Sequence, residues 1–243
     1  MRLVELSRRE HRGLRIRADR VEACASGQHL IPLVVSEFRK AAIQYPIVFA
    51  KSPETGRFGA YALNGLAPEE NLFWTGTELD VAYVPLNVRR QPFYVGTDDA
   101  GNANVLCIDL DSPCLDPAGT KTIVDADGGD SAYLKEMLAV LHELVAGRKL
   151  TEQFIETALA RDLLVPITLD IVLDDGTPLQ AHGLYGLDEE RFRQVGVGEV
   201  GKLWQGGSLD LFHAVLISSG QIVRLIQRKN KRIALSRAWQ GKG

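Results

Sequence analysis

Two adjacent arginines, Arg89 and Arg90, lie in a segment that is otherwise apolar or aromatic. Tyr83 precedes them and Phe93 follows them. A guanidinium keeps its charge, binds a carboxylate or phosphate through its planar fork and stacks on aromatic rings. We therefore expect these four residues to form a binding site for an acidic side chain, a peptide terminus or a partner protein. The alternative is structural, with one arginine paired to an internal acid such as Asp80 or Asp109 and the other solvated.

A second candidate is the run Val105–Ser112, an apolar strand that ends in Asp-x-Asp and resembles the first motif of haloacid-dehalogenase-type phosphatases. The resemblance implies that Asp109 attacks phosphorus, that Asp111 handles the leaving-group proton and that Mg²⁺ joins the two. The later pair Asp174–Asp175 could supply a further acidic motif. However, Asp109 lies far into the chain, Pro113 is atypical, and no alternation of strands and helices surrounds the run. These features favour a strand that runs into a polar turn.

Other residues that could carry chemistry lack the required spacing. His142 and Glu143 do not begin an H-E-x-x-H motif, because Ala146 stands where the second histidine belongs. The chain has no G-x-S-x-G elbow and no P-loop, and no strand-to-helix unit surrounds the glycines near residue 198. We therefore expect no metal and no cofactor. Outside the Asp109 and Asp111 alternative, we expect no catalytic residue.

The composition is that of an ordinary globular protein. Its 243 residues are 45% hydrophobic and 24% charged, and a formal net charge of -3 predicts no general attraction to nucleic acid or anionic membrane. Three cysteines without C-x-x-C spacing suit a reducing compartment. The charged N-terminus lacks the apolar core of a signal peptide, and no stretch approaches the roughly 18 apolar residues of a membrane span. We expect a cytoplasmic protein without a transmembrane segment, which leaves signal-independent export open.

Three ordered segments carry a resemblance to a known family. They are Tyr45–Ala50 (YPIVFA), Tyr83–Phe93 (YVPLNVRRQPF) and Cys107–Pro113 (CIDLDSP). Together they resemble the SapC family, bacterial proteins of about this length that are named for an association with surface-layer proteins. The resemblance extends from about His11 to about Arg232, which is nearly the whole chain.

The resemblance implies a non-catalytic accessory protein in a cell-surface or nutrient-uptake context. As the family is understood, relatives are often encoded beside outer-membrane receptors and iron-dependent oxygenases. Combined with the two arginines, this predicts binding of a peptide or protein partner through the Arg89–Arg90 segment. The alternative is a Mg²⁺-dependent phosphate-handling enzyme that uses Asp109 and Asp111.

Short strands joined by turns predict a mainly antiparallel sheet. Pro46–Ala50 and Phe58–Leu63 are expected to form one hairpin. Ile167–Leu173 and Pro178–Gly183 are expected to form a second, closed by the turn Asp174–Thr177. Further strands are expected at Leu14–Arg17, Phe93–Val95 and Ala103–Ile108. With grouped helices between the hairpins, the chain is predicted to be α+β.

Apolar periodicity predicts five helices. The longest is the C-terminal helix, Ser208–Lys229. Gly147 is the predicted C-cap of the helix Ser131–Ala146. The other four ranges are Leu33–Gln44, Pro85–Gln91, Thr151–Ala160 and Ser131–Ala146.

The elements group into four predicted segments. These are a polar N-terminal segment (1–13), a first α+β unit (14–125), a helical pair, hairpin and C-terminal helix packed on it (126–232), and a basic tail (233–243). A weak internal duplication is also predicted, because Trp74–Leu86 resembles Trp204–Leu216. It would place Asp80 and Asp210 near helix starts. Chance similarity of turn and cap residues is the alternative.

Overall fold

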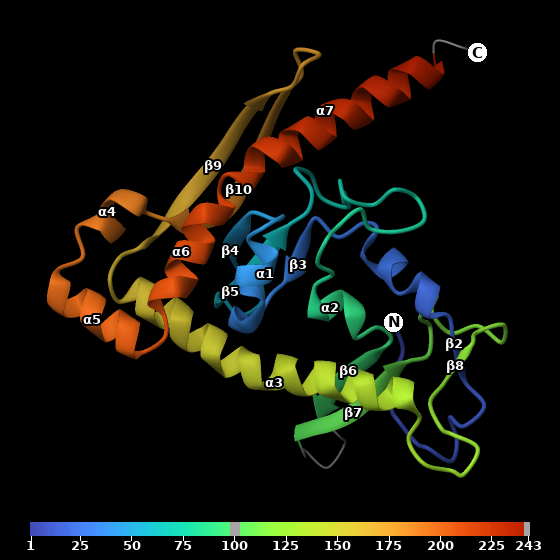
Figure 1. Cartoon of the computed structure of the whole chain (residues 1–243). Helices are drawn as coiled ribbons and strands as arrows, with labels where there is room; N and C mark the ends of the chain where they lie inside the picture. Colours follow the sequence, from blue (N-terminus) through green and yellow to red (C-terminus); the bar gives the residue numbers. More distant parts are fainter. Residues whose placement is uncertain (98–102, 241–243) are drawn as a thin grey trace.

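The computed structural model describes residues 1–97 and 103–240 (Figure 1). The strands are β1 (Leu3–Glu5), β2 (Arg15–Ile16), β3 (Leu30–Pro32), β4 (Ile47–Lys51), β5 (Phe58–Leu63), β6 (Phe93–Thr97), β7 (Ala103–Asp109), β8 (Lys121–Thr122), β9 (Leu164–Val172) and β10 (Pro178–Leu187). The helices are α1 (Phe38–Ala41), α2 (Leu86–Arg89), α3 (Ala132–Leu159), α4 (Glu189–Arg193), α5 (Val197–Gln205), α6 (Leu209–Ser218) and α7 (Gln221–Gln240), with 3₁₀ helices η1 (Ala18–Arg20), η2 (Glu22–Ala25) and η3 (Val35–Glu37). The mixture of helices and antiparallel sheets confirms the predicted α+β class.

The larger sheet has five strands in the order β3-β5-β4-β10-β9. β4 and β5 form the first predicted hairpin. β9 and β10 form the second, with Ile171 opposite Leu179, and Gly176 takes a φ of 83° in the Asp-Asp-Gly turn. β10 also pairs with β4, so strands from the predicted 14–125 and 126–232 segments share one sheet.

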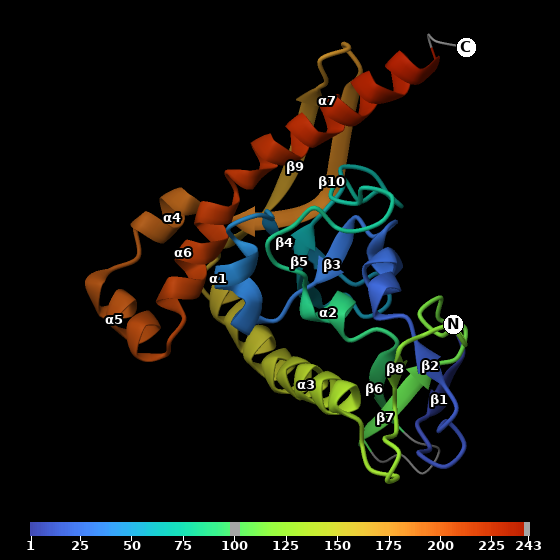
Figure 2. The ribbon, with the colours of Figure 1, turned by 45° about the vertical axis from the view of Figure 1, so that its right-hand side comes forward.

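A second sheet has three strands, with β7 between β1 and β6 (Figure 2). β6 and β7 lie where strands were predicted and pair antiparallel. β1 lies in the predicted polar segment 1–13, where no strand was expected, because three residues are too few to show an alternating pattern. Its conformation depends on pairing with β7, which places Val4 opposite Ile108.

The core lies between the five-stranded sheet and the helices α1, α3 and α6. The ring of Phe154 on α3 joins these elements. Its centroid is 5.5 Å from that of Phe38 on α1, 6.2 Å from that of Phe49 on β4 and 4.6 Å from that of Phe212 on α6. All four rings are buried, so these aromatic contacts hold three helices against one sheet.

The prediction of two helices separated at Gly147 is wrong, because α3 is continuous from Ala132 to Leu159. Gly147 does not end a helix but allows close packing, because a Cβ atom there would lie only 2.7 Å from Cβ of Val34. One turn later, the buried Thr151 hydroxyl donates to the Gly147 carbonyl at 2.7 Å and accepts from Val35 N at 3.0 Å. The glycine therefore marks where a second segment crosses the helix.

The predicted helix Leu33–Gln44 is also largely wrong. The chain forms only the short 3₁₀ helix η3 followed by the single α-helical turn of α1. Leu33 stays extended because its N–H donates to the Ala60 carbonyl at 2.9 Å, which continues the pairing of β3 with β5. Apolar side chains of this segment are buried on several sides of the chain, and their spacing resembles that of a helical stripe.

The predicted C-terminal helix Ser208–Lys229 is broken at Ser219 and Gly220 into α6 and α7. The last residue of α6, Ser218, is fully buried. Its hydroxyl donates to the Val215 carbonyl at 2.6 Å and accepts from Ile47 N at 2.9 Å, which ties the helix end to β4. Beyond the break, α7 runs alongside the β9–β10 hairpin (Figures 1 and 2).

By length and composition alone, the span Leu209–Ala238 is long and apolar enough to cross a membrane, which the sequence analysis did not expect. Only 28% of its most apolar window is buried. This is weak evidence, because other classes of helix pass the same test. The break at Gly220 also divides the span into two helices.

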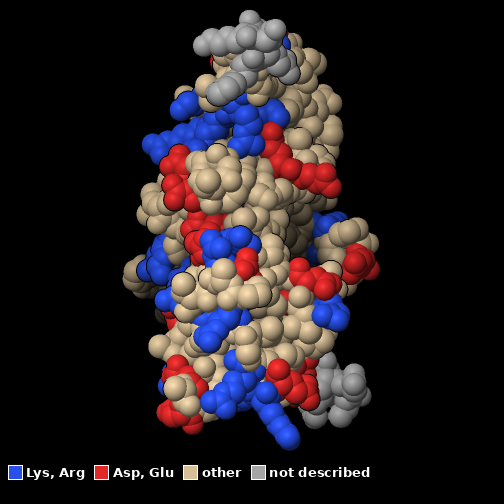
Figure 3. Space-filling view, turned by 90° about the vertical axis from the view of Figure 1, so that its right-hand side faces the viewer, with Lys and Arg blue, Asp and Glu red and all other residues tan. Residues whose placement is uncertain are grey.

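Basic residues of α7 form ion pairs with the loop that follows β5 and with the tip of the β9–β10 hairpin. Arg228 lies 3.0 Å from Asp80, and Lys229 lies 2.6 Å from Glu70. Arg237, in the predicted basic tail, lies 2.6 Å from Asp175. Figure 3 shows Lys and Arg side chains gathered at this end of the molecule with acidic side chains beside them. Residues 241–243 of that tail lie outside the described residues.

The predicted internal duplication is wrong. Trp74 forms an isolated bridge with Leu79, and Asp80 lies in a loop before α2. Trp204 instead lies in α5, and Asp210 lies in the first turn of α6. Because one segment is a bridged loop and the other is helical, their similarity reflects shared turn and cap residues.

Candidate functional site

Glu37 holds the segment that carries the two arginines. Its buried carboxylate accepts hydrogen bonds from Val34 N at 2.9 Å, from Leu86 N at 2.8 Å and from the Tyr83 hydroxyl at 2.9 Å. Burial raises the pKa of Glu37, while the three donors favour the ionised form. Because Leu86 begins α2, this carboxylate fixes the position of α2 and of the arginines at its end.

Arg90, the residue after α2, is half-buried, with its guanidinium 3.9 Å from the centroid of the Tyr94 ring. Nε donates to Asn87 Oδ1 at 3.0 Å, and Nη1 donates to the Phe93 carbonyl at 2.9 Å. Burial lowers the pKa of Arg90, but a guanidinium remains charged under physiological conditions. Among residues 1–97 and 103–240, no carboxylate lies within ion-pair distance of it. Among the described residues, the fold therefore orients this positive charge without pairing it with an acid.

Arg90 lines a pocket of about 320 Å³ between α3 and the strands β5 and β6. Besides Arg90, the polar residues that line the pocket are Tyr61, Asn87, Tyr94, Arg148, Thr151 and Glu152. Its walls are mainly apolar and are formed by Leu33, Val34, Phe58, Leu141, Leu144, Val145 and Ile155. The volume is at the lower end of the range of about 300–1,000 Å³ for ligand sites. The pocket can therefore hold an apolar side chain with an anionic group beside it.

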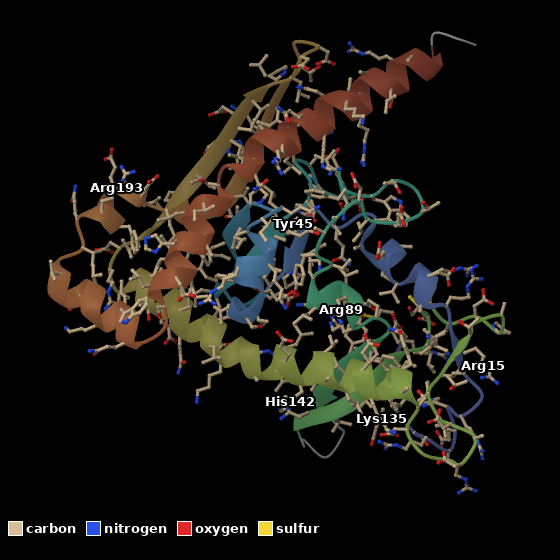
Figure 4. All side chains as sticks on the ribbon, viewed as in Figure 1. Arg15, Tyr45, Arg89, Lys135, His142 and Arg193 are labelled. Carbon is tan, nitrogen blue, oxygen red and sulfur yellow. The ribbon has the colours of Figure 1, made fainter. Side chains whose placement is uncertain are left out.

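The other three predicted binding residues lie outside this pocket. Arg89 points toward α3 and lies 3.6 Å from Glu136, in an ion pair that is open to solvent (Figure 4). Tyr83 is directed to Glu37, and Phe93 is fully buried. A pocket lies beside Arg90, but its aromatic lining residues are Phe58, Tyr61 and Tyr94, and Tyr83 and Phe93 are not among them.

Sequence reasoning missed the residues that α3 brings to the pocket. Leu141, Leu144, Arg148 and Glu152 are spaced by three or four positions, so one helical face could have been recognised from the sequence. The alternation of strand side chains likewise separates Tyr94 from the buried Phe93. Nothing in the sequence pairs that helical face with β5 and β6, because this contact joins segments far apart in the chain.

The Asp109 carboxylate accepts hydrogen bonds from the backbone of the protein. Its Oδ1 accepts from Arg2 N at 2.8 Å and from Asp111 N at 3.1 Å, which holds β1 against the end of β7. Asp111 lies 3.5 Å from the N-terminal amine and 3.8 Å from Arg2 Nε. β7 pairs antiparallel with both neighbours, so the parallel sheet of the phosphatase alternative is absent around it. Within the described residues, no three His, Cys, Asp or Glu side chains group as metal ligands.

Comparison with known proteins assigns the sequence to a family. A protein-family model described as SapC matches residues 6–225, which include α2, Arg90 and all the residues that line the pocket. No curated protein and no solved structure matches the chain. Because the family match covers nearly the whole sequence, the chain belongs to the SapC family.

Proposed function

We propose that this SapC-family chain is a non-catalytic accessory protein that binds a peptide or protein partner through the Arg90 pocket. The observation that carries the proposal is the half-buried guanidinium of Arg90, which has no acid partner among the described residues. Burying a charge without a counter-ion is costly, so a ligand carboxylate that reaches Arg90 recovers part of that cost.

The surroundings of Arg90 support a ligand that is both anionic and apolar. Tyr94 covers one face of the guanidinium, and Asn87 orients Nε, so little side-chain freedom remains to be lost on binding. Apolar side chains of α3, such as Leu144, line the adjoining wall. A carboxylate next to an apolar side chain, as at a peptide C-terminus, matches both features.

The family supports a cell-surface or nutrient-uptake context as part of the proposal. Surface-layer association is the property from which the family takes its name. A binding protein in that context would recognise a segment of a partner polypeptide. The engaged carboxylates of Asp109 and Asp111 give no support to the phosphate-handling alternative.

The test is isothermal titration calorimetry with short peptides that carry an apolar residue next to a carboxylate. One series presents the carboxylate as a free C-terminus, with amidated peptides as controls. The other presents it as a glutamate side chain, with glutamine as the control. Binding should disappear when the carboxylate is neutralised, and the series that responds identifies its source.

Arg89 provides the matched control, because it neighbours Arg90 in sequence but pairs with Glu136 outside the pocket. Arg90→Lys should weaken binding by roughly tenfold or more, since lysine lacks the planar fork. Arg89→Lys should bind as the wild type does. Equal affinity for neutral and acidic peptides, or equal losses in the two variants, would contradict the proposal.

A further inference from the structure

Two cysteines that are far apart in sequence meet in the structure. Cys24 and Cys114 are separated by 90 positions, and their sulfur atoms lie 3.3 Å apart. Both are free thiols. Cys24 lies in η2, and Cys114 lies in the turn that leads from β7 toward β8. Their contact joins the N-terminal part of the chain to the end of the three-stranded sheet.

The backbone on both sides of this contact is already held in place. Arg17 N donates to the Cys114 carbonyl at 2.8 Å, and Asp116 N donates to the Arg15 carbonyl at 3.1 Å. Arg20 also pairs with Asp116 at 2.9 Å. The two sulfur atoms are therefore kept close by the folded backbone, independently of any bond between them.

The two thiols differ in access and acidity. Cys24 is partly exposed, whereas Cys114 is fully buried. The hydrogen bond from the Cys24 thiol lowers the pKa of Cys114 to about 7, with smaller contributions from Ser112 and Arg20. The same contact raises the pKa of Cys24. The contact therefore favours the thiolate form of Cys114 over that of Cys24.

We propose that Cys24 and Cys114 form an intramolecular disulfide, with a low-molecular-weight disulfide such as oxidised glutathione as the oxidant. The partly exposed Cys24 passes its proton to the adjacent Cys114 thiolate, attacks one glutathione sulfur, forms a mixed disulfide and releases one glutathione thiolate. Cys114 gives that proton to the released glutathione thiolate, then attacks Cys24 Sγ and releases the second glutathione as its thiolate. The two cysteines lose two protons and two electrons, and one glutathione disulfide is reduced to two glutathione molecules.

The cross-link distinguishes two states of the protein. When oxidised, it closes a long loop and restricts the unfolded chain, which stabilises the fold. When reduced, the two segments are joined by non-covalent contacts alone, such as those around Arg17 and Asp116. The bond persists in an oxidising compartment and is removed by the thiol pool of a reducing one. This modification does not depend on the proposed partner binding.

The experiment treats the folded, full-length protein with oxidised glutathione and measures its intact mass, followed by non-reducing peptide mapping. Cys107→Ser is the matched control, because Cys107 is the third free cysteine and lies in β7, where its Sγ contacts the Val105 carbonyl at 3.6 Å. Wild type and Cys107→Ser should each lose two hydrogens in mass, with the Cys24 and Cys114 peptides linked. Dithiothreitol should reverse both changes.

The single variants test the order of events. Cys114→Ser should retain one glutathione on Cys24, and Cys24→Ser should form neither the cross-link nor an adduct on the buried Cys114. Oxidation should raise the Tm of the wild type by about 10 °C. If Cys114→Ser fails to fold, Cys24→Ser and the wild-type map still decide. A folded wild type that keeps both thiols, a stable adduct on Cys24 or a cross-link through Cys107 would overturn the proposal.

Discussion

The turn after β7 and the pocket beside α2 each hold a charged side chain at the end of a short element. They differ in whether the protein itself supplies partners that compensate the charge. In the turn, Asp109 accepts two backbone N–H groups from the chain itself. In the pocket, Arg90 is stacked and oriented by neutral groups, with no acid partner among the described residues. A charge that the fold satisfies is part of the structure, whereas a charge that it only orients can receive a ligand.

Glu37 resembles Asp109, because its charge is compensated by hydrogen bonds within the protein, although it contacts α2. It is more deeply buried than Arg90, and its three hydrogen bonds come from the protein itself. The neighbourhood of α2 therefore contains one structural charge and one available charge. Substitutions at the two positions should separate stability from binding.

The largest effect is expected for Glu37→Ala, which removes the acceptor of three hydrogen bonds. Leaving Val34 N and Leu86 N without partners should lower the free energy of unfolding by roughly 3 kcal/mol. Urea denaturation measures this loss. Glu143→Ala is the control: Glu143 is exposed and accepts only the Ser36 hydroxyl, so the change should stay within about 0.5 kcal/mol. A loss at Glu37 no larger than that of the control would contradict a structural role for this carboxylate.

A smaller loss, about 2 kcal/mol, is expected for Asp109→Ala, because two N–H groups lose their acceptor. Asp109→Asn should recover most of it, since both bonds go to Oδ1 and an amide oxygen can accept them. Denaturation of the two variants gives the result. Equal destabilisation by alanine and asparagine would show that the negative charge matters, which the structural interpretation of Asp109 does not require.

Arg90→Gln should show the opposite pattern to Glu37→Ala. It removes hydrogen bonds to Asn87 and the Phe93 carbonyl, so the free energy of unfolding should fall by only about 1 kcal/mol. Affinity for an acidic peptide should fall by roughly tenfold or more, because the counter-charge is lost. Thermal denaturation and calorimetry on the same sample separate the two quantities. A large fall in stability with affinity unchanged per folded molecule would make Arg90 structural.

The smallest effect is a pH dependence at Glu37. Burial raises the pKa of this carboxyl in the folded state above its unfolded value, so ionising it costs stability. The favourable contribution is present below the unfolded pKa and is lost as the pH rises through the folded pKa. Relative to Glu37→Gln, the wild type should therefore lose stability from about pH 4.5 upward. A difference that is flat with pH would mean that the three donors fully offset the burial.

Local sequence patterns predicted the parts of the fold that depend on neighbours in the chain. The Asp-Asp-Gly turn and its two flanking strands were recognised because turn chemistry and alternation are local properties. Gly147 was misread as a helix end, because its role is to admit Val34 from a distant segment. Likewise, the break after Ser218 depends on Ile47, which lies on β4.

For the candidate site, residue types alone identified the Arg89–Arg90 segment as a place that could bind an anion. They did not distinguish the two arginines, because adjacent residues of one type have the same chemistry until neighbours are assigned. Glu136 on α3 pairs with Arg89, whereas Tyr94 stacks on Arg90. That assignment depends on where α3 crosses α2 and β6.

Patterns within the chain were enough to predict the α+β class, the two hairpins, the SapC resemblance and the segment that carries the candidate site. Which charges are satisfied, which residues line the pocket and that Cys24 meets Cys114 followed from the folded structure alone. The physical reason is the distance in sequence over which each kind of interaction acts. Turns, caps and alternation arise between residues a few positions apart, whereas charge neutralisation and burial depend on contacts between segments that the chain separates by tens of residues.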